Sequence, residues 1–135
     1  MLDAYLYTGR RSPFGRHAGA LARLRPDDML ASVIAQVVAD SGFAPETIED
    51  VVVGCANQAG EDSRCVARHA ALVAGLPIEI PGSVLQRNCG SGLNAIAMAL
   101  RPLPQLRCST EPGISIGSPA TSAAWRATQR LSSPA

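Results

Sequence analysis

Cys89 is the residue of this chain whose type and surroundings best suit covalent chemistry. It lies in the segment Asn88-Cys89-Gly90-Ser91-Gly92. Because Asn is a favoured helix N-cap, we predict that Cys89 lies in the first turn of a helix, where backbone N–H groups and the helix dipole favour a thiolate. The glycines leave room for an acyl thioester near the sulfur, and the turn amides can stabilise an oxyanion. The segment therefore predicts a cysteine nucleophile, with its neighbours supporting the turn and the helix start.

A purely structural interpretation of the same segment stays open. Gly90, Ser91 and Gly92 can simply form a tight turn between a strand and a helix, with Cys89 buried and inert. The other cysteines are Cys55, Cys65 and Cys108. None forms a C-x-x-C pair and both histidines stand alone, so we predict no metal site.

A third interpretation is a thiol-based redox protein. It predicts disulfide formation among Cys55, Cys65 and Cys89. The missing C-x-x-C pair disfavours this interpretation, because no resolving thiol is held beside the first.

The elements that position Cys89 follow from hydrophobic periodicity and from start and stop signals. Val51 to Val53 is a β-branched run typical of a buried parallel strand, and Pro26 and Gly42 mark the start and end of a helix. In the second helix we expect Val66, Ala70 and Val73 to face inward. In chain order we predict a strand at 2–7, a helix at 26–41, a strand at 51–53, a helix at 63–74, a strand at 83–87 and a helix at 92–100.

Strands that alternate with helices indicate an α/β fold with parallel strands, here in the order βαβαβα. From Arg101 the composition shifts toward Pro, Ser and Thr. We therefore predict a folded part at 1–100 and an irregular, disordered tail at 101–135, because Trp125 alone cannot offset the entropy of ordering it.

Composition narrows the function classes. The 135 residues suit one small domain, 47% are hydrophobic and the net charge is +1. This charge gives no argument for nucleic acid, and no apolar run reaches the length of a membrane helix. The first residues lack the pattern of a signal peptide, so we expect a cytoplasmic protein.

Residues 83–96, which contain Cys89, resemble the active-cysteine signature of the thiolase family, which includes acetyl-CoA C-acyltransferases and acetyl-CoA acetyltransferases. Residues 11–16, 54–62 and 64–77 resemble three further family segments in the correct order. The resemblance runs from Asp3 to about Ala99 and covers only the amino-terminal portion of a thiolase. Its first blocks look closest to bacterial acetyl-CoA or 3-oxoadipyl-CoA acyltransferases.

This resemblance implies that Cys89 accepts an acyl group from an acyl-CoA, in thiolysis of a 3-oxoacyl-CoA or in condensation of acetyl-CoA. It implies no cofactor, since CoA is itself a substrate. The family's activating histidine, second cysteine and thioester-binding asparagine belong to the later half. We therefore expect no independent activity.

Two further expectations follow from the resemblance. The similarity is lost abruptly at Leu100 or Arg101, which suggests a frameshifted or truncated gene. The alternative function is a non-catalytic fragment that associates with a full-length thiolase or with a second copy of itself, because exposed strand edges and helix faces favour association.

Overall fold

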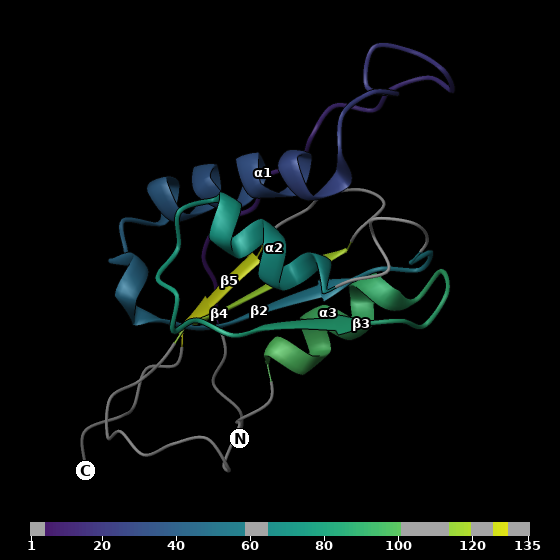
Figure 1. Ribbon diagram of the computed structural model, residues 1–135. Helices are drawn as coiled ribbons and strands as arrows, with labels where there is room; N and C mark the ends of the chain where they lie inside the picture. The colour runs from purple at the N-terminus through teal and green to yellow at the C-terminus, as the bar shows by residue number, and fades with distance from the viewer. Residues whose placement is uncertain (1–4, 59–64, 101–113, 120–125, 130–135) are drawn as a thin grey trace, which may run out of the picture.

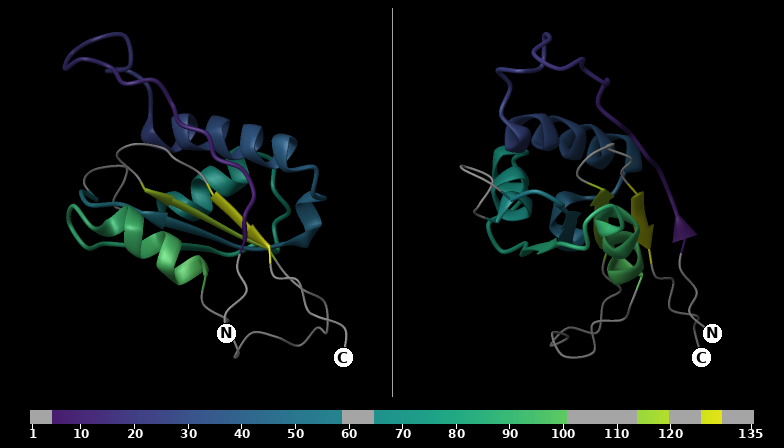
Figure 2. Two further views of the ribbon diagram at one scale, coloured as in Figure 1. Left: turned by 180° about the vertical axis from the view of Figure 1, so that it is seen from behind. Right: turned by 90° about the vertical axis from the view of Figure 1, so that its right-hand side faces the viewer.

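The computed structural model describes residues 5–58, 65–100, 114–119 and 126–129. It shows a three-layer α/β arrangement, with one sheet between two helix layers (Figure 1). Helices α1 and α2 lie together on one face of the sheet, and α3 lies on the other (Figures 1 and 2). Alternating strands and helices, with parallel pairing at the centre, confirm the predicted α/β class.

The sheet has the strand order β1-β5-β4-β2-β3. Strand β2 pairs in parallel with β3 on one side and with β4 on the other, whereas β5 is antiparallel to both β4 and β1. Strand β1 therefore runs in the same direction as β2. The strands are β1 (Tyr5–Leu6), β2 (Ile48–Gly54), β3 (Gly82–Leu85), β4 (Ile114–Pro119) and β5 (Arg126–Gln129).

Helix α1 (Pro26–Ser41) begins and ends where the sequence predicts. Pro26 occupies its first turn, and Gly42 caps it in the left-handed conformation, with φ 72°. The buried residues of α1 pack with those of β2 and α2 (Val66–Val73) in one hydrophobic core. Ile34, Val37, Val51 and Val53 are its largest fully buried side chains.

One orientation predicted for α2 is wrong. Val66 and Ala70 are buried as expected, but Val73 is 59% exposed. The buried face of α2 also includes Ala67 and Ala71. This face is therefore rotated toward Ala67 and Ala71, and Val73 lies at its edge. Small side chains bring α2 close to the sheet: a Cβ at Gly82 of β3 would lie 2.5 Å from the backbone nitrogen of Arg68.

Strands β4 and β5 lie in the part of the chain for which the sequence predicted no regular element. That prediction rested on the Pro, Ser and Thr content of residues 101–135 and on Trp125 as their only large anchor. Strand β2 explains the difference, because a buried central strand requires hydrogen-bonding partners on both of its edges. Strand β4 supplies the second partner, opposite β3. The remaining residues of 101–135 lie outside the described part of the chain.

Candidate active site

Cys89 lies between β3 and α3 (Ser91–Ala99), at the carboxyl edge of the parallel strands. It is an exposed, free thiol. In open α/β sheets, ligands bind at this edge, beyond the carboxyl ends of the strands. Residues 86–90, here called the cysteine turn, thus present the sulfur to solvent at an edge where ligands can reach it.

Asn88 has a different role from the predicted N-cap. Its φ is +46°, in the left-handed region, and the N-cap of α3 is Gly90. The backbone N–H of Gly90 donates to the carbonyl of Arg87 at 2.9 Å, and that of Ser91 donates to the carbonyl of Asn88 at 3.2 Å. The chain therefore makes one more tight turn before the helix starts, and Cys89 lies just outside the first helical turn. Asn suits this position because its short polar side chain tolerates left-handed backbone.

Ser91 holds the cysteine turn together. The residue is 3% exposed, and its hydroxyl donates to the carbonyl of Asn88 at 2.7 Å. The same oxygen accepts the backbone N–H of Arg87 at 2.8 Å. One hydroxyl thus pairs with a donor before Asn88, the Arg87 N–H, and with an acceptor after it, the Asn88 carbonyl. Residue types alone do not indicate this pattern.

Gly54 is a site-supporting residue that sequence analysis missed. A Cβ at this position would lie 2.4 Å from the carbonyl carbon of Ser91 and 2.6 Å from the backbone nitrogen of Gly92. The end of β2 therefore touches the first turn of α3 directly. A glycine that ends a β-branched strand is the available sequence signal for such a close approach. By contrast, a Cβ at Gly90 would meet only ordinary contacts, the nearest at 3.4 Å.

Polar contacts join the cysteine turn to its surroundings. The Arg87 guanidinium donates to the side-chain oxygen of Asn94 at 3.3 Å, and Gln86 donates to the carbonyl of Ala56 at 3.2 Å. Cys55 follows β2, is buried, and donates its backbone N–H to the carbonyl of Leu85 at 2.9 Å. The ends of β2 and β3 are therefore fixed to each other beside Cys89.

The titration behaviour of two buried carboxyl groups differs. Burial raises the pKa of Asp50 in β2, a shift opposed by a hydrogen bond from the Val51 backbone, and within the described residues its Oδ1 has no hydrogen-bond partner. The Arg25 side chain holds the pKa of Asp27 below its ordinary value through a hydrogen bond of 2.7 Å. Neither carboxyl belongs to the cysteine turn.

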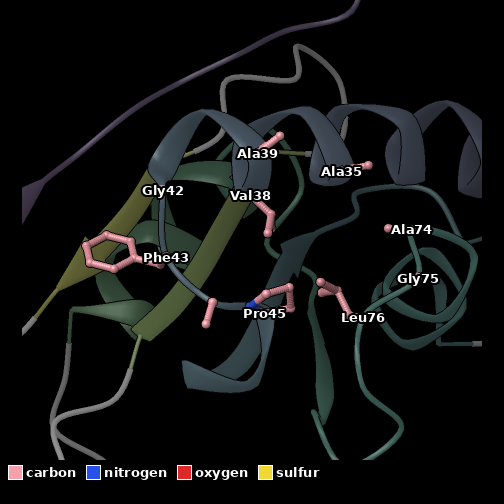
Figure 3. Close-up of a pocket in the computed structure, with 10 residues that line it drawn as sticks. Ala35, Val38, Ala39, Gly42, Phe43, Pro45, Ala74, Gly75 and Leu76 are labelled. Carbon is pink, nitrogen blue, oxygen red and sulfur yellow. The ribbon is translucent and has the colours of Figure 1, made fainter.

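A separate apolar groove of about 530 Å³ lies where the ends of α1 and α2 meet (Figure 3). Val38, Gly42, Phe43 and Leu76 are among the lining residues of this groove, and no lining residue comes from the cysteine turn.

In the described ranges, no group of three or more His, Cys, Asp or Glu side chains is arranged to hold a metal ion. None of the helices described in the structure is both long and apolar enough to cross a bilayer.

A layered α/β sheet that presents a cysteine between a parallel strand and a helix defines a class of candidate thiol-nucleophile proteins. The family described as "Thiolase, N-terminal domain" matches residues 5–108. The chain therefore belongs to the thiolase family.

Curated relatives agree with this assignment. The chain is 49% identical over 104 residues to a beta-ketoadipyl-CoA thiolase of Acinetobacter baylyi, across 76% of this chain and 26% of that protein. The 3-oxoadipyl-CoA/3-oxo-5,6-dehydrosuberyl-CoA thiolase of Escherichia coli K12 is 46% identical over the same coverage. The chain thus spans about a quarter of the length of these relatives.

The fold is similar to that of a crystal structure, the acetyl-CoA acetyltransferase of Bacillus anthracis. The TM-score is 0.75 at 28% sequence identity, covering 88% of this chain and 29% of the other. The fold of the chain is thus similar to that of part of this acetyltransferase structure.

Proposed function

We propose that this chain is the amino-terminal part of a thiolase-type acyl-CoA acyltransferase and that Cys89 carries the acyl group. One observation supports this most directly: Cys89 is an exposed residue with a free thiol, yet it lies in a turn fixed between β3 and α3. A large CoA thioester can reach such a sulfur, and the neighbouring residues hold its backbone in one conformation. Asn88, Gly90, Ser91 and Gly92 support that turn.

In thiolysis, the Cys89 thiolate attacks the 3-oxo carbon of a 3-oxoacyl-CoA. The bond between C2 and C3 breaks, C2 takes up a proton, and acetyl-CoA leaves. The remaining acyl group stays on Cys89 as a thioester. The thiol of CoA then attacks this thioester, which releases a shortened acyl-CoA and frees Cys89. Condensation of acetyl-CoA is the reverse sequence, and neither direction requires a metal or redox cofactor.

For the substrate, we propose a 3-oxoacyl-CoA such as 3-oxoadipyl-CoA. The support is the names of the two relatives described above, a beta-ketoadipyl-CoA thiolase and a 3-oxoadipyl-CoA/3-oxo-5,6-dehydrosuberyl-CoA thiolase. The match to a 3-ketoacyl-CoA thiolase of Bacillus subtilis is lower, at 36% identity.

Complete turnover is expected to need groups beyond this chain. By the family resemblance, the activating histidine, the second cysteine and the asparagine that helps bind the thioester oxygen belong to the later half of a thiolase. Loss of a general base alone commonly costs ~10²–10⁴-fold in rate. We therefore expect the chain by itself to accept an acyl group slowly and not to complete the cycle.

Acylation is tested by incubating the chain with acetyl-CoA and measuring intact mass and the labelled peptide. We expect one acetyl group on Cys89, gained at least about tenfold faster than on Cys65, which is also an exposed thiol. Cys89→Ser should abolish the fast label, and Cys65→Ser should retain it. An acetyl adduct that persists in Cys89→Ser, or equal labelling of the two thiols, contradicts the assigned role.

A second candidate function is a non-catalytic module that binds a complete thiolase. Two observations favour it: Leu93 on α3 is 75% exposed, and β3 forms an edge of the sheet. An exposed apolar side chain and an unpaired strand edge both favour association.

A further inference from the structure

We propose that Ser91 is a positioning residue for Cys89: its hydroxyl fixes the peptide between Asn88 and Cys89 and so sets where the sulfur and the backbone N–H of Cys89 point. This inference rests on the proposed acyl transfer to Cys89.

The hydrogen bonds of Ser91 define this role. Its hydroxyl donates to the Asn88 carbonyl at 2.7 Å, and its backbone N–H approaches the same oxygen at 3.2 Å. That carbonyl belongs to the peptide whose N–H is that of Cys89. The peptide is trans, so its N–H points opposite to the carbonyl and away from the Ser91 hydroxyl. Two bonds to one oxygen therefore fix the direction of the Cys89 N–H.

The hydroxyl also stabilises the uncommon conformation of Asn88. A non-glycine residue at φ +46° is disfavoured and persists where the surrounding structure holds it. The Ser91 hydroxyl accepts the Arg87 N–H at 2.8 Å and donates to the Asn88 carbonyl, so it joins the peptide that precedes Arg87 to the peptide that follows Asn88. Without this oxygen, both peptides lose a partner, and Asn88 is free to relax toward the common φ region. Cys89 follows directly and would change direction with it.

Ser91 has a rigid support for this task. It is the first residue of α3, it is 3% exposed, and its carbonyl group lies against Gly54 at the end of β2. The helix and the central strand thus hold Ser91 in place, and Ser91 in turn holds the cysteine turn. Its side chain is not part of the hydrophobic core formed by α1, α2 and β2. Removing the hydroxyl should therefore affect the turn more than the fold.

The test compares alkylation of Cys89 and Cys65 by iodoacetamide in the same molecule, with peptide mass mapping. We expect Ser91→Ala to lower the Cys89 rate about tenfold, which corresponds to about 1.4 kcal/mol, with the Cys65 rate unchanged. Ser91→Thr keeps the hydroxyl and should keep most of the Cys89 rate. Ser32→Ala is the matched control, because the Ser32 hydroxyl makes a similar 2.8 Å bond to the Met29 carbonyl on α1.

An unchanged ratio of the Cys89 and Cys65 alkylation rates in Ser91→Ala overturns the proposal. Equal losses of the Cys89 rate in the Ala and Thr variants also overturn it, because they would indicate that packing matters and the hydroxyl does not.

Hydrogen exchange of the wild-type chain adds a measurement that needs no variant. The Arg87 amide should be protected by the Ser91 oxygen, and exchange as fast as in an unfolded peptide overturns the proposal. Iodoacetamide needs no acyl transfer, so a failure of Cys89 to react with acetyl-CoA contradicts only the proposed function.

Discussion

At the scale of single residues, two glycines near Cys89 have different reasons to be glycine. Gly54 has no room for a Cβ, because the backbone of Ser91 lies 2.4 Å from where that atom would be. Gly90 has φ −91°, which any residue can adopt, and its nearest contact to a Cβ is 3.4 Å. Close packing therefore requires glycine at the end of β2, whereas the N-cap of α3 tolerates a small side chain.

These contacts predict opposite outcomes for two matched variants. Gly54→Ala should lower the free energy of unfolding by about 1–3 kcal/mol or more, because β2 and α3 must move apart. Gly90→Ala should change it by less than about 1 kcal/mol. Urea unfolding followed by circular dichroism measures both. Equal costs for the two variants would contradict the contact assigned to Gly54.

Also at this scale, sequence analysis placed Cys89 correctly between a strand and a helix, but it did not predict the backbone conformation of the residue before it. Cys89 does lie between a strand and a helix and is exposed. The prediction of Asn88 as N-cap is wrong, because N-cap preference describes an average residue before a helix. Here, a side-chain hydroxyl two residues after the cysteine makes a further turn more favourable.

At the scale of elements, the central strand β2 contains a buried carboxyl group, that of Asp50. Side chains alternate along a strand, so Asp50 shares the face of Gly54, which touches α3. Asp50 is 7% exposed, and burial raises its pKa. Its folded-state pKa thus lies above the unfolded value. At low pH the Asp50 carboxyl is protonated in both states, and burying the neutral group avoids the cost of burying a charge. As pH rises through the folded-state pKa, the buried group must ionise, and the stability that the neutral form provided is lost.

Asp50→Asn should accordingly raise the free energy of unfolding at pH 7, by about 1 kcal/mol, since it removes a buried charge whose Oδ1 has no hydrogen-bond partner among the described residues. Near pH 3 the two proteins should differ little. Asp27 shifts in the opposite direction, but it is common to both proteins and cancels in the difference. Denaturant titrations at several pH values test this, with Glu79→Gln at an exposed site as control. Destabilisation at pH 7 by Asp50→Asn would show that the carboxylate makes a favourable contact.

At the scale of the whole molecule, the described part of the chain leaves surfaces that suit a partner. The chain spans about a quarter of its curated relatives, β3 is an edge strand, and Leu93 is exposed on the α3 side of the sheet. The hydrophobic core lies on the opposite side, beneath α1 and α2. If the chain binds a complete thiolase, as the second candidate function states, the α3 side is where contact is expected.

Size-exclusion chromatography with a complete beta-ketoadipyl-CoA thiolase checks this. We expect co-elution for the wild-type chain and loss of co-elution for Leu93→Glu, because the substitution puts a charge into the proposed contact. Leu72→Glu is the matched control, since Leu72 is 42% exposed on α2, in the opposite helix layer. Elution of the wild-type chain only as a separate monomer, or equal effects of the two variants, would count against association through α3.

The sequence by itself determined the features that depend on neighbouring residues. Proline and glycine set the ends of α1, the valine run defined β2, and the motif around Cys89 placed a thiol between a strand and a helix. These signals depend on backbone preferences and side-chain periodicity over a few residues.

Only the tertiary structure decided the features that join distant residues. They are the contact of Gly54 with Ser91, the burial of Asp50 and the place of β4 beside β2. It also decided that the Ser91 hydroxyl holds Asn88 in a left-handed conformation. The physical reason is that close packing and hydrogen-bond satisfaction depend on which surfaces meet after the chain has folded, and local residue preferences do not specify that meeting.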